Sequence, residues 1–238
     1  MSALTLAVPS KGRIRDDALA TLARAGIEVA PPADARSYRT EAANVPGLEV
    51  AFLSASEIAR ELVRGTVPLG LTGLDLMWEA AGEGDLDADP QARETFGAAR
   101  LVAPLDFGHA DVVVALPAVW FDVASMTDLA DIAAGFRSLH GHRLRVATKY
   151  RRLARHHLAR CGVRPVRLVE SLGATEGAPH AGLADVIVDI TSTGSTLRAN
   201  GLKVPRGGRI LESRTCLFAA GEVPAPAREI AERIAALG

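Results

Sequence analysis

Cysteine is scarce in this chain of 238 residues. The two cysteines, Cys161 and Cys216, stand far apart, and neither belongs to a CxxC pair. This usage excludes a disulfide framework and a structural zinc site. It also predicts a reducing compartment, of which the cytoplasm is the simplest case.

An excess of charge of one sign is also missing. Lysine and arginine number 27 against 28 aspartates and glutamates, which gives a net charge of -1, and there is no long basic run. Electrostatics therefore give no reason to expect a nucleic acid or a membrane surface as a partner. Any recognition of phosphate must come from a local arrangement of residues.

Long apolar runs are absent as well. Only a run of five consecutive, weakly apolar residues precedes Pro9, too few for the core of a signal peptide, and no later segment approaches the length that crosses a bilayer. Hydrophobic residues still make up 48% of the chain, enough for a soluble globular protein. The length allows one large domain or two lobes of roughly 100 residues each.

The common catalytic signatures do not occur. The sequence has no Gly-x-Ser-x-Gly elbow and no HExxH, and its loops fit neither the P-loop nor the GxGxxG pattern. Of the six histidines, only His140 and His142 are close enough to suggest a metal, and no third ligand stands near them. All six are interpreted as structural or solvated, and no metal bound by protein ligands is predicted.

Two patterns of alternating strands and helices recur along the chain. A strand at 4–8, a lysine loop and a helix at 14–25 return as a strand at 144–148, a second lysine loop and a basic helix. Segments 67–80 and 186–199 both read as strand, Thr-Gly turn and helix. Two copies of one order predict an α/β protein of two doubly wound lobes, with the site in a cleft between them.

The lobe boundaries are expected where the chain passes from one lobe to the other. The first lobe is predicted to consist of residues 1–107 and 204–238, and the second of residues 108–203. Ile230, Ile234 and Leu237 recur at helical spacing behind Pro226, which predicts a docked amphipathic helix at the end of the chain.

Small hydroxylated residues follow the apolar strand at 186–188. Asp189 closes this strand, and residues 191–196 are all Thr, Ser or Gly. The unpaired N–H groups and the dipole at a helix start suit a phosphate, and Asp189 could accept hydrogen bonds from ribose hydroxyls. The alternative is an ordinary strand-to-helix turn with a hydroxyl cap. The predicted phosphate contacts are Ser192, Thr193, Gly194, Ser195 and Thr196.

Two weaker candidates lie in the first lobe. Lys11, Gly12 and Arg13 form a cationic loop before a helix, which could hold a polyphosphate or be a solvated connection. Gly73 and Asp75 repeat the turn of the second lobe, although Asp75 could simply complement a helix dipole.

Two charged residues of the second lobe, Glu176 and Lys149, each allow a functional interpretation and a purely structural one. Glu176 lies in a loop of small residues, where it could contact a ligand or be an ordinary surface glutamate. Lys149 is a weaker candidate for a cationic contact, and its alternative is a surface lysine before a basic helix.

Several motifs together resemble one enzyme family. The segments VPSKGR, LGLTGLDL, GATEGAP and DITSTGSTLRANGLK are similar, in this order, to ATP phosphoribosyltransferase, the first enzyme of histidine biosynthesis. The resemblance extends from residue 4 to about residue 220. It implies a two-lobed fold like that of the type II periplasmic binding proteins. It also implies attack of adenine N1 of ATP on the anomeric carbon of phosphoribosyl pyrophosphate, with release of pyrophosphate and with Mg²⁺ on the phosphates.

The resemblance assigns roles to the candidate residues. The loop 192–196 would hold the 5-phosphate, and Asp189 with Glu176 would hold ribose hydroxyls or the metal-bound substrate. The 11–13 loop would face the polyphosphate or the pyrophosphate. Gly73 and Asp75 would line the first-lobe side.

The sequence departs from the family pattern at two places. The family usually reads Pro-Lys-Gly-Arg, whereas Ser10 stands between Pro9 and Lys11 here. The family often has an arginine where this chain has Ser54. The candidates to replace that arginine are Arg36, Arg39 and Arg60.

The length resembles the short form of the family, because the chain stops at Gly238. The resemblance then implies a homodimer that assembles with a separate regulatory subunit resembling histidyl-tRNA synthetase. Two rival hypotheses remain open. One is a two-lobed binding module that captures a small anion without turnover, and the other is a sugar-phosphate isomerase with Asp189 and Glu176 as acid and base.

Overall fold

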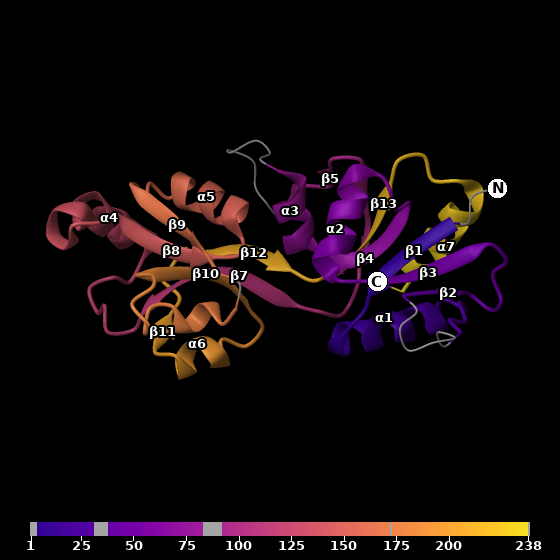
Figure 1. The fold of residues 1–238 in the computed structure, drawn as a ribbon, viewed down its shortest axis with the longest axis horizontal. Coiled ribbons are helices and arrows are strands. Elements are labelled where there is room, and N and C mark those ends of the chain that lie inside the picture. Colours follow the sequence, from indigo (N-terminus) through magenta and orange to yellow (C-terminus); the bar gives the residue numbers. More distant parts are fainter. Residues whose placement is uncertain (1–3, 31–37, 83–91, 172, 238) are drawn as a thin grey trace. The chain divides into compact units, whose positions relative to one another are not determined.

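The computed structural model describes residues 4–30, 38–82, 92–171 and 173–237, in which strands and helices alternate (Figure 1). The chain divides into two compact units. Unit 1 comprises Met1–Ala81, Arg93–His109 and Ser213–Gly238, and unit 2 comprises Gly82–Ala92 and Ala110–Glu212. No helix among the described residues is long and apolar enough to span a bilayer.

Unit 1 is built on a seven-stranded sheet with the strand order β2-β3-β1-β4-β13-β6-β5. β1 pairs in parallel with β3 and β4, and β13 is antiparallel to β4 and β6. The parallel pairs are connected through helices, as crossovers between parallel strands require. The elements are β1 (Leu4–Pro9), α1 (Gly12–Arg24), β2 (Arg39–Glu41), β3 (Leu48–Leu53), α2 (Ala55–Arg64), β4 (Leu69–Gly73), α3 (Leu74–Ala81), β5 (Thr95–Phe96), β6 (Ala99–Pro104), β13 (Thr215–Ala220) and α7 (Ala225–Ala235).

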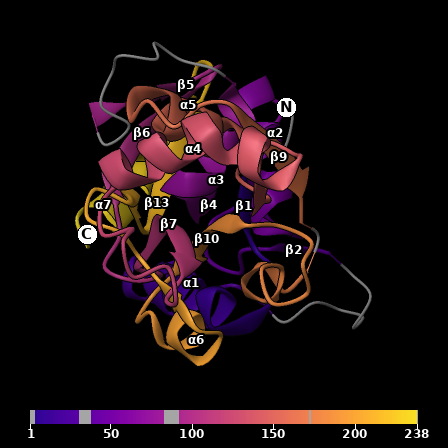
Figure 2. The same cartoon turned by 90° about the vertical axis from the view of Figure 1, so that its left-hand side faces the viewer.

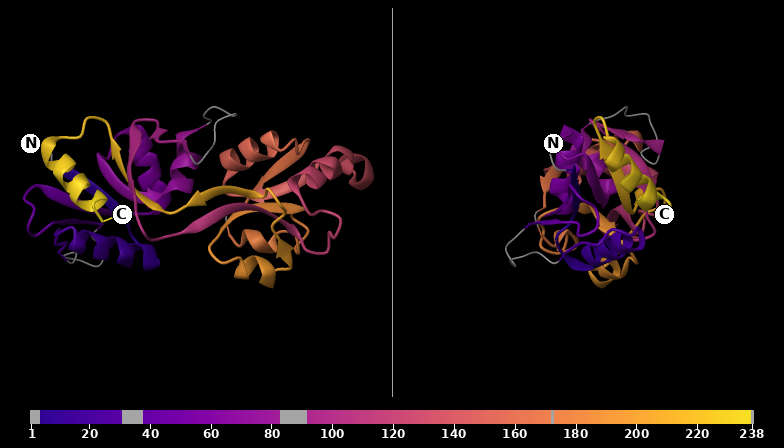
Figure 3. Two further views of the ribbon diagram at one scale, coloured as in Figure 1. Left: turned by 180° about the vertical axis from the view of Figure 1, so that it is seen from behind. Right: turned by 90° about the vertical axis from the view of Figure 1, so that its right-hand side faces the viewer.

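Helix α7 covers the core of unit 1. Its Ile230 and Ile234 are buried in one cluster with Leu22 of α1 and the central strands. Arg233 donates hydrogen bonds of 2.8 and 2.7 Å to the carbonyl oxygens of Ala25 and Gly26, just beyond the end of α1. The predicted docked amphipathic helix is therefore confirmed, and Figure 3 shows it at the C-terminal end of the ribbon.

Unit 2 is built on a sheet with the order β11-β7-β10-β8-β9, and β12 pairs with β7. β10 is parallel to β8 and antiparallel to β7, and β8 is parallel to β9. Helices α5 and α6 lie on opposite sides of this sheet (Figure 2). The elements are β7 (Ala110–Pro117), α4 (Met126–His140), β8 (Leu144–Thr148), α5 (Arg151–Arg160), β9 (Val166–Glu170), a 3₁₀ turn (Thr175–Gly177), β10 (Val186–Thr191), α6 (Ser195–Ala199), β11 (Leu202–Lys203) and β12 (Arg209–Ser213).

The repeat predicted from the sequence is a repeat of topology. The order β3-β1-β4-β13 in unit 1 matches β9-β8-β10-β7 in unit 2, with three parallel strands followed by an antiparallel one in each case. Both lysine loops follow the second strand of this order, and both Thr-Gly turns follow or end the third. The two units are therefore two versions of one α/β arrangement.

The boundary on the return to unit 1 lies later than the sequence predicts. Unit 2 extends to Glu212, beyond the expected end at Lys203, and the first crossing follows His109 rather than residue 107. The reason is β12, which pairs with β7 of unit 2 before the chain continues into β13 of unit 1. The segment 210–220 is thus divided between the two sheets.

Removal of one α7 side chain should destabilise unit 1. Ile234 has no exposed surface, so Ile234→Ala should lower the free energy of unfolding by about 2–4 kcal/mol through lost burial and a residual cavity. Urea unfolding followed by circular dichroism measures this change. Glu229→Ala, on the exposed face of the same helix, is the control. Equal effects of the two substitutions would contradict the docking of α7.

Candidate functional site

A pocket of about 330 Å³ lies where β10 ends and α6 begins. It brings together most of the second-lobe residues predicted from the sequence. Gly194, the remaining one, lies within the same loop as the left-handed N-cap of α6, with φ of 69°. The pocket is lined by Glu176, Asp189, Ile190, Thr191, Ser192, Thr193, Ser195, Thr196 and Leu197.

The loop between β10 and α6 is held by its own hydroxyl groups. The amide of Gly194 donates to Thr191 Oγ1 at 3.0 Å, and the amide of Ser195 donates to Thr193 Oγ1 at 3.3 Å. Two of the amides expected to face an anion are therefore used inside the loop. Each hydroxyl oxygen that accepts such a bond keeps its own proton for donation. Hydroxyl groups are thus the more available donors of this loop.

A guanidinium group lies against the same loop. A Cβ atom on Gly194 would approach Arg198 Nη1 to 3.0 Å, so the small residue makes room for this side chain. Arg198 is an exposed residue of α6, four positions after Gly194. The sequence analysis missed it, although the spacing of one helical turn could have indicated it.

Asp189 is a largely buried carboxylate with a cation beside it. Its side chain is 14% exposed, its Oδ1 accepts a 2.9 Å bond from the amide of Ile190, and Lys149 Nζ lies 3.8 Å from the same oxygen. Burial raises the pKa of Asp189, and the negative charge of Glu176 adds to this. The Ile190 amide, Lys149 and Thr175 oppose the shift without cancelling it.

The position of Lys149 follows from strand pairing. Thr148 of β8 lies opposite Val188 of β10 in parallel register, so the next residue of each strand reaches the same level. Lys149 is an exposed lysine, as one of its two interpretations predicts, and it also lies beside Asp189. The parallel pairing of the two strands is the feature that could have indicated this contact.

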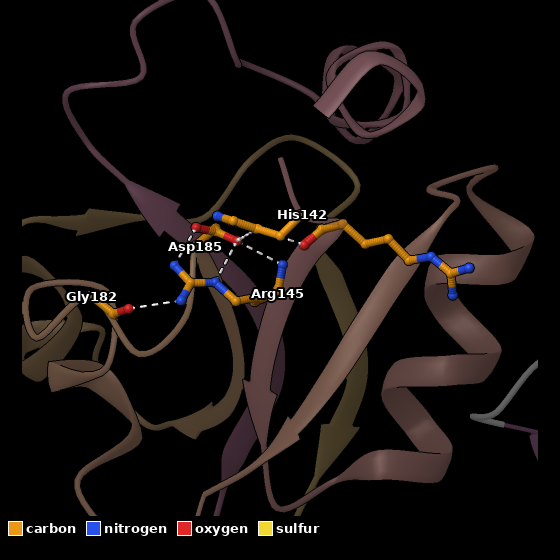
Figure 4. Close-up of polar contacts among 5 residues, drawn as sticks. His142, Arg145, Gly182 and Asp185 are labelled. Carbon is orange, nitrogen blue, oxygen red and sulfur yellow. Dashed lines mark hydrogen bonds and ion pairs between the residues drawn. The ribbon is translucent and has the colours of Figure 1, made fainter. Parts of the chain in front are cut away.

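A second carboxylate of unit 2 has the opposite electrostatic environment. Asp185 accepts two bonds from the Arg145 side chain, at 2.9 and 3.2 Å, and one from the Arg145 amide at 2.7 Å (Figure 4). Burial alone would raise the pKa of Asp185, but the bonds from Arg145 outweigh it and lower the pKa. Arg145 also donates to the carbonyl of Gly182 at 2.8 Å. Through Gly182 and Asp185, Arg145 holds the end of the 173–185 segment, which carries Glu176, against β8.

In unit 1, the loop after β1 borders a pocket of about 590 Å³. Lys11 is the N-cap residue of α1, and Gly12 follows with φ of 68°. Because Pro9 of β1 lies opposite Leu53 of β3 in parallel register, the loop lies beside Ser54. Arg13, also predicted for the site, is exposed and does not line this pocket. The lining residues are Pro9, Ser10, Lys11, Ile14, Tyr38, Phe52, Leu53, Ser54, Ala55 and Glu57.

Ser54 has a local structural role at the position where an arginine is expected. Its Oγ accepts a 3.3 Å bond from the amide of Glu57 and so caps α2. Of the proposed replacements, Arg39 pairs with Glu49 at 2.6 Å, Arg60 is exposed on α2, and Arg36 lies outside the described residues.

Arg15, which the sequence analysis did not single out, lies next to this pocket. Its guanidinium group is 5.2 Å from the centre of the Phe52 ring. Phe52 lines the pocket. Arg15 is therefore a further cation near Lys11.

Gly73 and Asp75 belong to a buried contact in unit 1 rather than to the lining of the Lys11 pocket. Asp75 is 4% exposed, and its Oδ1 accepts a 2.7 Å bond from Ser213 Oγ. The amide of Asp75 donates to the same hydroxyl oxygen at 3.1 Å. A Cβ atom on Gly73 would collide with Asp75 Oδ1, which explains the glycine.

Among the described residues, no group of three or more His, Cys, Asp or Glu side chains is arranged to hold a metal ion. A cation near the unit 2 pocket would meet two carboxylates, Asp189 and Glu176. Mg²⁺ commonly binds through one or two carboxylates together with substrate phosphates. The donor set therefore fits a Mg²⁺ ion that arrives on a phosphorylated ligand.

Replacement of Asp189 or Asp185 by asparagine should change Tm in opposite directions at pH 8. The folded pKa of Asp189 is raised, so its ionised form weakens folding once the pH exceeds that pKa, and the effect vanishes below the unfolded value of about 3.9. Asp189→Asn should therefore raise Tm at pH 8 by about 1–3 °C and leave it unchanged near pH 3, well below the unfolded pKa. Scanning calorimetry at the two pH values measures this.

Asp185→Asn is the matched control for that substitution. The folded pKa of Asp185 is lowered, so its ionised form stabilises the fold above about pH 4, and this stabilisation is lost as the pH falls through the folded pKa. The control should lower Tm at pH 8. A lower Tm for Asp189→Asn at pH 8 would mean that the Lys149 contact outweighs burial.

Comparison with known proteins gives the family. A sequence profile described as ATP phosphoribosyltransferase matches residues 54–237. The ATP phosphoribosyltransferase of Mesorhizobium japonicum is 54% identical over 217 residues, which cover 91% of this chain and 89% of the relative.

Two solved structures share the fold. The ATP phosphoribosyl transferase (HisG:HisZ) complex from Thermotoga maritima matches with a TM-score of 0.63 at 22% identity, over 97% of this chain and 98% of that one. The arginine-bound form of truncated ArgBP from T. maritima matches with a TM-score of 0.51 at 13% identity, over 99% and 94%. The expected α/β fold resembling the periplasmic binding proteins is confirmed. With 54% identity over nine-tenths of its length and a matching profile, the chain belongs to the ATP phosphoribosyltransferase family.

Proposed function

We propose that this chain transfers the phosphoribosyl group of phosphoribosyl pyrophosphate to N1 of the adenine of ATP and releases pyrophosphate, the first step of histidine biosynthesis. The observation that carries the proposal is the unit 2 pocket, where Asp189, Glu176 and the 192–196 loop come together in a chain that belongs to this family.

The loop 192–196 binds the 5-phosphate of the pentose. Thr193 and Ser195 lie 2.8 Å apart through their hydroxyl oxygens, and such groups can turn their protons toward an anion. Arg198 adds a positive charge at Gly194. Hydrogen bonds to a charged group contribute roughly 1.5–3 kcal/mol each, so three or four of them would anchor a sugar phosphate.

Asp189 and Glu176 accept hydrogen bonds from the ribose hydroxyls or face the Mg²⁺ carried by the substrate. Lys149 offsets part of the negative charge at Asp189. When bound, Mg²⁺ neutralises charge on the pyrophosphate group that leaves. The chain itself needs to hold the pentose in place and keep Asp189 ionised.

Unit 1 supplies the contacts to the polyphosphate. Lys11 is a cation on the wall of the 590 Å³ pocket, and Gly12 gives the backbone its left-handed turn at the start of α1. Arg13 is assigned to the same role from the family pattern. Gly73 and Asp75 are proposed to shape the substrate side of unit 1 through the Asp75–Ser213 contact.

No nucleophilic side chain is required for this displacement. Burial raises the pKa of Cys216 to about 12, and burial also raises the pKa of Cys161, so both thiols stay protonated at neutral pH. Catalysis then rests on positioning two substrates and stabilising the charge of the leaving group.

The partners follow from the family. The similar T. maritima protein is described as a HisG:HisZ complex. We propose that this chain forms a homodimer and assembles with a regulatory subunit that resembles histidyl-tRNA synthetase. With ATP and phosphoribosyl pyrophosphate as its substrates, we propose a cytoplasmic location.

The activity itself is tested by pyrophosphate release. Purified protein with Mg²⁺, ATP and phosphoribosyl pyrophosphate should release pyrophosphate, with or without the regulatory subunit, only when both substrates are present. Release with one substrate would contradict the transfer, and no release even with the regulatory subunit would favour the binding module. Conversion of a single sugar phosphate would favour the isomerase.

The 5-phosphate contact is tested by Ser195→Ala. Loss of one hydrogen bond to a charged group should raise the KM for phosphoribosyl pyrophosphate about tenfold and leave the KM for ATP unchanged. Thr127→Ala, at an exposed hydroxyl of α4, is the control. An unchanged KM for phosphoribosyl pyrophosphate would remove Ser195 from the site.

A further inference from the structure

Lys149 of unit 2 has hydrogen-bond donors that the described part of the chain does not use. Its Nζ lies 3.8 Å from Asp189 Oδ1, which is beyond the range of a hydrogen bond, and its side chain is 50% exposed. Within the described residues it donates no hydrogen bond, whereas Lys203 donates one of 2.6 Å to the carbonyl oxygen of Trp120. The three N–H donors of the Lys149 ammonium group are therefore available to a ligand.

Compensation of the charge of Asp189 does not by itself account for this lysine. Unit 2 neutralises another carboxylate, Asp185, through hydrogen bonds of 2.9 and 3.2 Å from Arg145, and these bonds lower the pKa of Asp185 (Figure 4). Lys149 leaves the pKa of Asp189 raised, because burial outweighs a cation that lies 3.8 Å away and is open to water. The geometry is that of a cation kept near the carboxylate but not bonded to it.

Two neighbours keep the ammonium group at the carboxylate end of the unit 2 pocket. One is Asp189, which lines the pocket together with Glu176. The other is the buried ring of Tyr150, whose centre is 5.0 Å from Lys149 Nζ. Arg198 lies against Gly194 in the phosphate loop. The pocket thus has one cation beside its phosphate loop and another beside its carboxylates.

The stereochemistry of phosphoribosyl pyrophosphate relates these carboxylates to the leaving group. The pyrophosphate has the α configuration at C1, so it lies on the same face of the ribose ring as the 2- and 3-hydroxyls. If Asp189 and Glu176 hold those hydroxyls, they also approach the pyrophosphate and repel it. A cation beside Asp189 lies where it offsets this repulsion.

We propose that Lys149 is a catalytic residue that binds the pyrophosphate group of phosphoribosyl pyrophosphate and stabilises it as it leaves. This inference rests on the proposed function. During the transfer, N1 of adenine forms a bond to C1 with its lone pair, the C1–O bond breaks, and the electron pair of that bond leaves on the pyrophosphate oxygen. Lys149 donates hydrogen bonds to the pyrophosphate oxygens and keeps its proton. Because negative charge grows on the leaving oxygen, the contact is stronger in the transition state than in the bound substrate.

Each substrate then has cations of its own. Arg198 and Lys149 of unit 2 serve the two ends of phosphoribosyl pyrophosphate. Lys11 of unit 1 is left to the polyphosphate of ATP. Loss of Lys149 should therefore affect one substrate and not the other.

Calorimetric titration of the full chain at pH 8 with Mg²⁺ distinguishes a pyrophosphate contact from an effect through Asp189. Lys149→Met, which removes the charge but keeps the length of the side chain, should weaken binding of phosphoribosyl pyrophosphate and of pyrophosphate by about tenfold or more. Binding of ribose 5-phosphate should change by less than about twofold, because this ligand lacks the pyrophosphate. Lys149→Arg should restore most of the lost affinity. Arg151→Gln removes an exposed positive charge two residues away and should leave all three affinities unchanged.

Steady-state kinetics test the contact in the transition state. Lys149→Met should lower kcat by about tenfold or more and raise the KM for phosphoribosyl pyrophosphate, with the KM for ATP unchanged. An unchanged kcat would overturn the proposed stabilisation of the leaving group.

The remaining outcomes decide the proposal as follows, once circular dichroism and Tm establish that each variant is folded. Equal weakening of ribose 5-phosphate and pyrophosphate binding would mean that Lys149 acts only through Asp189, and would overturn the proposal. Unchanged pyrophosphate binding, or an equal loss in Arg151→Gln, would overturn it as well. Wild-type protein that binds phosphoribosyl pyrophosphate but releases no pyrophosphate with ATP would refute the transfer, while the calorimetric comparison would still decide whether Lys149 contacts pyrophosphate.

Discussion

Parallel strand register is the constraint on which both candidate pockets depend. In unit 2, Thr148 opposite Val188 brings Lys149 level with Asp189. In unit 1, Pro9 opposite Leu53 brings the Lys11 loop beside Ser54. A shift of one residue in either pair would turn these side chains to the other face of the sheet. The chemistry of each pocket therefore rests on backbone hydrogen bonds between strands that are distant in sequence.

The sequence predicts what is local and repeated. The alternation of strand, loop and helix is enough to predict two α/β units. The run of Thr, Ser and Gly after Asp189 predicts a ligand loop, and in the structure this loop lines a pocket. The contact of Lys149 with Asp189 and the place of Arg198 were not predicted, because they depend on strand pairing and on helical spacing rather than on a motif. The end of unit 2 was placed too early because nothing local reveals that β12 pairs with β7.

The two carboxylates of unit 2 show how one sheet serves two purposes. Asp185 satisfies its charge with Arg145 and fastens a loop. Asp189 keeps a charge that burial disfavours, with Lys149 at 3.8 Å as partial compensation. Strained electrostatics of this kind are typical of functional positions, where stability is exchanged for the ability to bind a ligand. Ser54 of unit 1 also favours stability. Its hydroxyl caps α2, whereas the arginine that the family often has at this position would add a positive charge and leave the helix without this cap.

The route of the chain through the two sheets has a consequence for synthesis on the ribosome. The body of unit 2 is one continuous stretch, Ala110–Glu212, so its strands can all pair soon after they emerge. Unit 1 needs β13, which lies between β4 and β6, and α7, which covers its core, and both come last. The N-terminal half of unit 1 must therefore wait, with β4 lacking its neighbour, until β13 and α7 have been synthesised. Unit 1 is therefore the first to begin and the last to be complete. Until β13 pairs with β4, the edge of β4 is exposed, and this edge is where a chaperone would be needed.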